Sequence, residues 1–273
     1  MSSEPTLILI PGAWHIPSIW DKVTSILSDQ QYKCIPIKLP STTPTPSTSF
    51  LNDITVVRNA IKAEITQGRN VVVIGHSYGG PVGSSAIRGL TRPKHSQSQP
   101  QHQGHNPTTS PTNAQGHVIG LALLATGFTI TGLSVLASMG GTPPPFWRIN
   151  LESNDIEITA PLRELFYHDL SLDEGNDWVC KLEKQAAKAF LEGGEHVYAG
   201  WMDVPVWNLI TTEDNALPYD VQRSYVEMAR AEGGDVTVRE VDSGHSLMLS
   251  RVDETVEFIL DAVRAFAGER AMS

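Results

Sequence analysis

The chain has 273 residues, 40% of them hydrophobic, which is enough for one sizeable α/β domain that carries a smaller insertion. Its net charge is −10 at pH 7, and lysine and arginine form no cluster anywhere along it. This charge pattern argues against nucleic acid and against an anionic membrane surface as partners.

The N-terminal segment has no basic region, and its apolar run at residues 7–10 is too short for a signal peptide or a membrane span. We therefore expect a soluble protein of the cytoplasm. The two cysteines, Cys34 and Cys180, show no disulfide spacing, which predicts two reduced, buried thiols.

Short apolar runs alternate with segments of helical periodicity, a pattern typical of a mostly parallel sheet flanked by helices. The apolar runs predict strands at residues 6–10, 32–39, 70–75, 117–125, 204–211 and 235–241. Apolar residues at helical spacing predict helices near residues 19–27, 50–65, 80–90, 221–229 and 256–266. Gly68 is expected to end the second helix just before a strand.

Two stretches interrupt this alternation. Residues 92–117 contain almost no apolar side chain, which predicts a disordered surface insertion, and the histidines there match no metal-ligand spacing. Residues 128–203 are rich in aromatic side chains, which predicts a lid, or cap, over one end of the sheet. The core domain would then comprise residues 1–127 and 204–273.

The segment Gly75-His76-Ser77-Tyr78-Gly79 follows an apolar strand and precedes a helical segment. This strand, tight turn and helix is the arrangement of a nucleophile elbow, in which only small residues fit two positions before and after the serine. The motif therefore predicts Ser77 as a catalytic nucleophile. A plain glycine-rich turn is the alternative.

A serine nucleophile needs a base to take its proton and an acid to orient that base. Asp214 and His245 each follow the end of a predicted strand, and the carboxyl ends of parallel strands meet at one edge of a sheet. The order serine, acid, histidine is that of an α/β-hydrolase. Asp214 could instead cap a helix and His245 could belong to a turn, while other carboxylates compete with Asp214: Glu213, Asp242 and Asp203.

The oxyanion formed when Ser77 attacks a carbonyl needs hydrogen-bond donors. The backbone N–H of Tyr78 follows the nucleophile directly. The N–H of Ala13 lies in the loop after the first strand, where Gly12 lets the chain turn closely. Neither donor is a side chain, so the sequence predicts only the loops that supply them.

Aromatic residues of the predicted lid and the first loop suggest an apolar or aromatic substrate group. Packing within the lid would explain any single one of them equally well. No metal or organic cofactor is required for this chemistry. The predicted substrate-binding residues are Trp14, Phe146, Trp147, Phe166, Tyr167 and Trp201.

Four segments together resemble the α/β-hydrolase superfamily, in the branch of plant methylesterases, hydroxynitrile lyases and related fungal hydrolases. They read "LILIPGAWHIPSIWDKV", "GHSYGG", "ITTEDNALP" and "SGHSLMLSRVDETVEFI". The resemblance covers nearly the whole chain except residues 92–117, and its lid sequence is similar to the fungal members. It implies the α/β-hydrolase fold, the triad of Ser77, Asp214 and His245, and the oxyanion positions Ala13 and Tyr78.

The chain departs from this family in the first loop, where the histidine usual before the glycine is replaced by Pro11. The lyases of the branch carry threonine in place of Gly12 and lysine in place of Ser246. The resemblance therefore implies cleavage of an ester or lactone of a small, largely apolar molecule, in fungal secondary metabolism. A carbon–carbon bond hydrolase, a lyase, an acyl transferase or a ligand-binding protein that retained the site remain alternatives.

Overall fold

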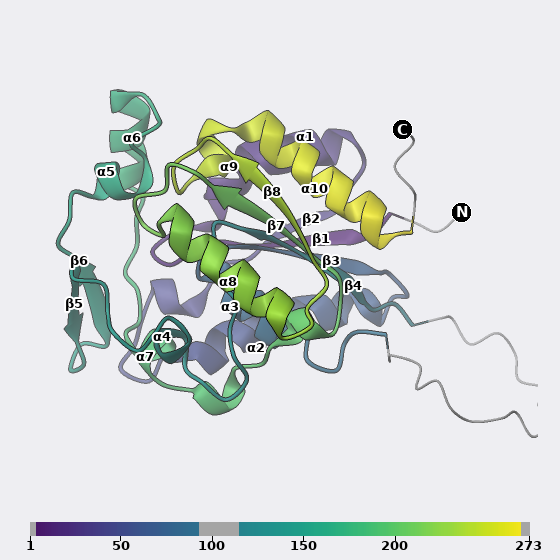
Figure 1. Ribbon diagram of the computed structural model, residues 1–273, viewed down its shortest axis with the longest axis horizontal. Coiled ribbons are helices and arrows are strands. Elements are labelled where there is room, and N and C mark those ends of the chain that lie inside the picture. The colour runs from purple at the N-terminus through teal and green to yellow at the C-terminus, as the bar shows by residue number, and fades with distance from the viewer. Residues whose placement is uncertain (1–3, 93–114, 269–273) are drawn as a thin grey trace, which may run out of the picture.

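The computed structural model describes residues 4–92 and 115–268, and within these ranges six strands form one parallel sheet (Figure 1). The strands lie side by side in the order β2-β1-β3-β4-β7-β8. Their bounds are Thr6–Ile10 (β1), Cys34–Pro36 (β2), Val71–His76 (β3), Val118–Leu124 (β4), Val206–Thr211 (β7) and Val236–Val241 (β8). The insertion expected at residues 92–117 falls mostly on residues 93–114, which lie outside the described residues.

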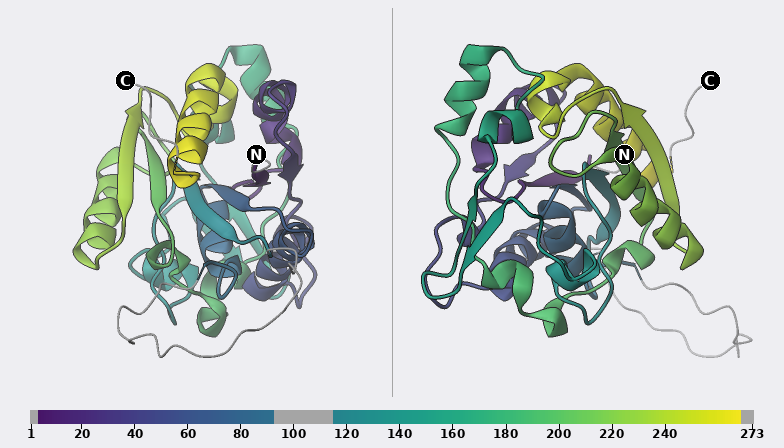
Figure 2. Two further views of the ribbon diagram at one scale, coloured as in Figure 1. Left: turned by 90° about the vertical axis from the view of Figure 1, so that its right-hand side faces the viewer. Right: turned by 60° about the vertical axis from the view of Figure 1, so that its left-hand side comes forward.

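Helices cover both faces of the sheet. On one face α1 (Asp21–Asp29) packs against α10 (Val252–Phe266), and on the other α2 (Phe50–Ile65) packs against α3 (Gly79–Ala86). Helix α8 (Tyr219–Ala231) contacts β7 and β8, and the views in Figure 2 show α8 and α10 on opposite sides of β8. This is the mostly parallel sheet flanked by helices that the alternating sequence pattern predicts, and it agrees with the fold that the resemblance implies.

Two predicted elements end three or more residues earlier than expected. The second strand covers Cys34–Pro36 rather than residues 32–39, because it lies at the edge of the sheet and Pro36 has no N–H to donate. Helix α3 ends at Ala86 rather than Leu90, three residues before Gly89 adopts a left-handed φ of 69°. By contrast, α2 has the predicted bounds, and Gly68 follows it with a φ of 80°.

Residues 125–205 connect β4 to β7, and we call them the β4–β7 segment. They lie beside the carboxyl ends of the strands, at the left of Figure 1. The segment contains an antiparallel hairpin and several short helices. These elements are α4 (Val135–Ser138), β5 (Trp147–Asn150), β6 (Asp155–Ile158), α5 (Leu162–Phe166), α6 (Leu172–Val179) and α7 (Lys188–Leu191).

None of the helices in the described part of the chain is both long enough and apolar enough to cross a bilayer. The two cysteines are free thiols, as predicted, but they are not both buried. Cys34 is half-buried and Cys180 is exposed. Cys180 directly follows α6, which packs on the outer part of the molecule (Figure 1).

A buried carboxylate joins the first two strands to α2. Glu64, whose side chain is 4% exposed, accepts hydrogen bonds from Thr6 Oγ1 (2.8 Å), Lys33 Nζ (2.7 Å) and Arg69 Nε (2.5 Å). Burial alone would raise the pKa of Glu64, but the hydrogen bonds from Arg69, Lys33 and Thr6 lower it to about 2. The charged form is therefore the one that stabilises this junction.

Replacement of Glu64 by glutamine should lower the free energy of unfolding at pH 7 by about 2 kcal/mol, because a hydrogen-bonded charge is lost. The native pKa of Glu64 lies below its ordinary value, so this contribution is present above pH 4.5 and is lost as the pH falls towards 2. Urea unfolding of both proteins at pH 7 and pH 3 measures it. Glu157→Gln, in an exposed pair with Arg148, is the control and should change little. A difference independent of pH would contradict this account.

Candidate active site

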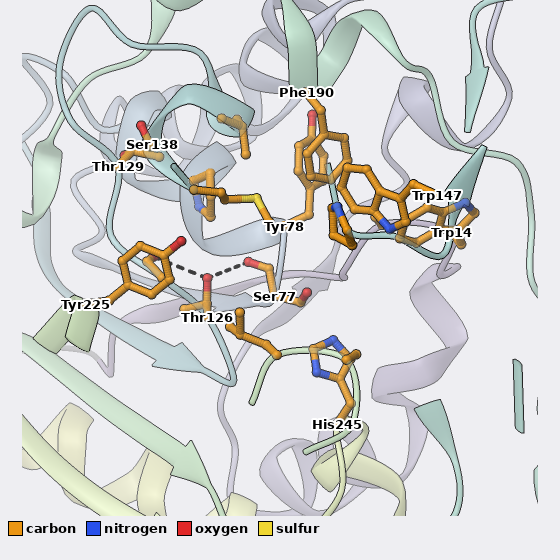
Figure 3. Close-up of a pocket in the computed structure, with 18 of the residues that line it drawn as sticks. Trp14, Ser77, Tyr78, Thr126, Thr129, Ser138, Trp147, Phe190, Tyr225 and His245 are labelled. Atoms are coloured by element: carbon orange, nitrogen blue, oxygen red, sulfur yellow. Dashed lines mark hydrogen bonds between the residues drawn. The ribbon is translucent and has the colours of Figure 1, made fainter. Parts of the chain in front are cut away.

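Ser77 lies in a tight turn between β3 and α3 with a left-handed φ of 49°. Its N–H donates to Leu124 O (3.0 Å), and its carbonyl accepts from Gly80 N–H (2.9 Å) and from Thr126 Oγ1 (2.6 Å; Figure 3). A Cβ added at Gly75 would lie 2.8 Å from Gly79 O, so a side chain does not fit there. The turn therefore has the strained geometry of a nucleophile elbow.

His245 and Asp214 form a buried pair beside Ser77. The Nδ1–H of His245 donates to Asp214 Oδ2 at 2.8 Å, and both side chains are at most 3% exposed. This bond fixes the tautomer, so Nε2 is the ring nitrogen left to accept a hydrogen bond. His245 lies in the same pocket as Ser77, directly below it in Figure 3.

Further hydrogen bonds orient the Asp214 carboxylate. Its Oδ1 accepts from the N–H groups of Ala216 and Leu217 at 2.8 Å each. Its Oδ2 accepts from Thr211 Oγ1 (2.8 Å) and from Gln222 Nε2 (3.3 Å) as well as from His245. The competing carboxylates are placed elsewhere: Asp242 accepts from Thr212, Asp203 from Tyr198, and Glu213 is exposed.

Two neighbours fix the loop that carries His245. The Nε2–H of His76 donates to the His245 carbonyl at 2.9 Å. Asp169, from the β4–β7 segment, accepts from Gly244 N–H at 2.8 Å and from Ser243 Oγ at 3.1 Å. A Cβ added at Gly244 would lie 2.7 Å from the His168 ring, so the two segments are in close contact.

The loop after β1, which contains Ala13, is fixed by a buried neutral histidine. The Nδ1–H of His15 donates to Ala13 O at 2.7 Å, and its Nε2 accepts from Tyr167 OH at 2.9 Å. Burial lowers the pKa of His15 to about 3, so the ring stays neutral. Trp14 adopts a strained φ of 63°, and its N–H donates to Gln185 Oε1 at 3.3 Å.

The side chain of Tyr78 is held by a buried carboxyl group. Its hydroxyl donates to Asp53 Oδ2 at 2.7 Å, and Asp53 Oδ1 accepts from Ser41 N–H at 2.9 Å. Burial raises the pKa of Asp53 to about 6, although the hydrogen bonds from Ser41 and Tyr78 oppose the increase. Burial, together with the Asp53 charge, also raises the pKa of Tyr78.

Ser77 opens into a largely apolar pocket with about 720 Å³ of empty space, which includes its mouth. Ala13, Tyr78 and His245 line it, and so do four of the six predicted substrate-binding residues: Trp14, Phe146, Trp147 and Phe166. No aspartate, glutamate, lysine or arginine of the described residues lines it.

The prediction that Tyr167 and Trp201 line the pocket needs correction. Tyr167 is fully buried behind the wall, where it bonds His15. Trp201 packs against Phe128, and its Nε1–H donates to Thr129 O at 2.8 Å. Both rings therefore support the wall rather than form it.

Several residues that shape the site were not predicted from the sequence. Asp169 bonds Gly244 from 75 residues away, and His15 is held by Tyr167 from 152 residues away. Gln222 bonds Asp214 from the following helix, and no local pattern indicates any of these three residues. Tyr225 lines the pocket from α8, although its spacing predicted a core position on that helix. In residues 4–92 and 115–268, no three histidine, cysteine, aspartate or glutamate side chains are grouped as a metal ligand set would be.

Comparison with known proteins identifies the family of this chain. The model of the alpha/beta hydrolase family matches residues 7–258, so the family predicted from the motifs is confirmed. The chain is 26% identical to alpha/beta hydrolase nvfD of Aspergillus novofumigatus, over 95% of this chain and 96% of that protein. It is 24% identical to probable hydrolase R7 of a Phoma species, over 89% and 91% of the two chains. A pyrethroid hydrolase from Sphingobium faniae shares the fold at a TM-score of 0.69, with 18% identity and coverage of 97% and 100%.

The buried carboxyl of Asp53 predicts a pH-dependent stability. Its native pKa lies above its ordinary value of 3.8, so the wild type should lose stability relative to Asp53→Asn as the pH rises from about 4 through 6. Urea unfolding at pH 4, 5.5 and 7.5 measures the difference. Tyr78→Phe, which keeps the carboxyl group, should show the same pH trend as the wild type. A constant difference between the wild type and Asp53→Asn would mean that Asp53 does not titrate in this range.

Proposed function

Because the chain belongs to the alpha/beta hydrolase family, we propose that it is a serine-dependent esterase that cleaves an ester or lactone of a small, largely apolar molecule through an acyl-enzyme on Ser77. The carrying observation is the buried His245–Asp214 pair beside a serine held at a left-handed φ. The apolar, uncharged pocket supports a neutral substrate. The resemblance to fungal members extends the proposal to secondary metabolism by analogy.

In the proposed mechanism His245 Nε2 takes the proton of Ser77 Oγ as the oxygen attacks the substrate carbonyl carbon. Asp214 stabilises the imidazolium that forms and remains ionised. The imidazolium then gives its proton to the leaving alkoxide oxygen, and the carbon–oxygen bond of the ester breaks. Water, deprotonated by His245, attacks the acyl-enzyme and releases the acid and Ser77.

The N–H groups of Ala13 and Tyr78 are the proposed donors to the oxyanion. Their loops are fixed before substrate arrives, Ala13 through His15 and Tyr78 through Asp53. Such preorganisation matters because each donor of this kind contributes about 100- to 1,000-fold to turnover. We further propose that residues 128–203 act as the lid of the site, since Phe146, Trp147 and Phe166 all belong to this range.

Gly12 supports hydrolysis over the lyase reaction. A Cβ at this position would lie 3.0 Å from His76 Nδ1 and 3.1 Å from Ser77 Cβ. The threonine found here in the resembling lyases would therefore crowd the nucleophile unless the loop shifted. Glycine instead keeps the space beside Ser77 open.

A fluorophosphonate should add once to the wild-type protein, since an activated serine attacks phosphorus as it attacks a carbonyl. Intact-protein mass spectrometry should show one adduct, absent from Ser77→Ala. Hydrolysis of short p-nitrophenyl esters, run in parallel, should be lost in the same variant. Folded wild-type protein that forms no adduct would remove the basis of the esterase proposal.

Replacement of Asp214 by asparagine should lower kcat by about 10⁴-fold, because the histidine would be held in the wrong tautomer. Its exposed neighbour provides the control, and Glu213→Gln should leave kcat within about twofold. The measurement is the steady-state rate with a p-nitrophenyl ester, with circular dichroism to check folding. A large loss of kcat in Glu213→Gln with a small loss in Asp214→Asn would show that Glu213, and not Asp214, orients the histidine.

A further inference from the structure

The pocket has two chemically different ends, with Ser77 between them (Figure 3). We call Trp14, Trp147 and Phe190 the aromatic end. We call Thr129, Ser138 and Tyr225 the hydroxyl end. In Figure 3 these two groups lie on opposite sides of Ser77.

The aromatic end is rigid and presents ring surface. Trp147 packs edge-on against Phe190 at 4.9 Å and against Trp14 at 5.7 Å between ring centroids. The indole N–H of Trp14 already donates to Ile156 O at 3.0 Å, so it is not available to a ligand. This end therefore suits a planar apolar group.

The hydroxyl end carries hydrogen-bonding capacity that the described part of the chain does not use. Thr129 is 2% exposed, and no residue described by the structure bonds its Oγ1. Ser138 Oγ accepts from Ile130 N–H at 3.3 Å, which leaves its own hydrogen to donate. Buried polar groups are normally paired, so the unpaired hydroxyl of Thr129, beside the unused hydrogen of Ser138, indicates a polar ligand group in this pocket.

Tyr225 is positioned for such a contact. Its ring packs so closely on Gly127 that a Cβ there would lie 2.7 Å from it. Among the residues described, none hydrogen-bonds its hydroxyl. Burial raises the pKa of Tyr225, so the group stays protonated and can donate at neutral pH.

We propose that the substrate is a neutral, two-part molecule in which the cleaved bond separates an aromatic or planar apolar group from a group bearing a hydroxyl or carbonyl oxygen. The oxygen is bound by Tyr225 and Ser138, with Thr129 beside them. This inference rests on the proposed function, since it places the cleaved bond at Ser77. It makes Tyr225 a specificity-determining residue.

The test uses pairs of esters that differ only by a hydroxyl group in place of a methyl group. One pair is 4-hydroxybutyl benzoate and pentyl benzoate, and the other, with the ring on the alcohol side, is phenyl 5-hydroxypentanoate and phenyl hexanoate. In at least one pair the hydroxyl member should have a kcat/KM about tenfold higher than its partner. A wholly apolar pocket would favour the alkyl member instead, because an unpaired hydroxyl is costly to desolvate.

Tyr225→Phe and Ser138→Ala should each lower this preference, the kcat/KM of the hydroxyl member divided by that of the alkyl member, about three- to tenfold. Tyr219→Phe is the matched control, because Tyr219 lies on the same helix with its hydroxyl bonded to the exposed Glu240. It should leave the preference unchanged.

Binding to Ser77→Ala separates this inference from the proposed function. Quenching of tryptophan fluorescence gives the Kd of each ester without turnover, and the hydroxyl member should again bind more tightly. If wild type hydrolyses no ester while this binding preference holds and is lost in Ser77→Ala/Tyr225→Phe, the proposed esterase function fails, and the recognition of a ligand oxygen at the hydroxyl end stands without the cleaved bond. Equal, reversed or undetectable binding of the hydroxyl members overturns the inference.

Discussion

The close contact between the nucleophile turn and the end of β1 determines the geometry of the site. A Cβ added at Gly79 would lie 2.5 Å from Ile10 O and 2.7 Å from Pro11 O. Helix α3 can therefore begin this close to β1 only because glycine occupies the position. The contact brings Ser77 and the loop with Ala13 together, so the nucleophile and the proposed oxyanion donor share one packed junction.

The β4–β7 segment completes this junction through buried polar contacts. Gln185 accepts from Trp14 N–H, and Tyr167 donates to His15. Asp169 accepts from Gly244 N–H, next to His245. Since each contact joins this segment to a loop of the sheet, the pocket and the His245–Asp214 pair depend on the same folded unit. Movement of the segment would therefore disturb both the pocket and the proposed oxyanion donors.

The sequence predicted the elements of this fold because apolar runs and helical spacing are local signals. Strand ends at Ser77, Asp214 and His245 followed from the same signals, because parallel strands align their carboxyl ends. The sequence could not distinguish the aromatic residues that line the pocket from those that pack behind them. Tyr167 and Trp201 have the same composition signal as the residues that line the pocket, and only tertiary packing places them behind it.

The residues that hydrogen-bond the site could not be predicted from the sequence for a second reason. Gln222, on α8, hydrogen-bonds Asp214 in the loop eight residues before it. His15 and Tyr167 are hydrogen-bonded although 152 residues separate them in the sequence. Such contacts leave no periodicity in the chain. Tyr225 does lie at helical spacing with the apolar residues of α8. This spacing predicts that the ring is buried, but it does not distinguish a ring that faces the core from one that faces a cavity.

The arrangement of the imidazole rings restricts where a proton can go. The ring of His76 lies next to those of His15 and His245, with centroid distances of 5.9 Å and 4.7 Å. Burial lowers the pKa of His15 to about 3 and that of His76 well below its ordinary value, and neither ring is bonded to a carboxylate of the residues that the structure describes. His245 alone among these three has one, Asp214. His245, which the proposed mechanism uses as the base, is therefore the ring with a carboxylate beside it, and the two neutral rings hold the loops around it.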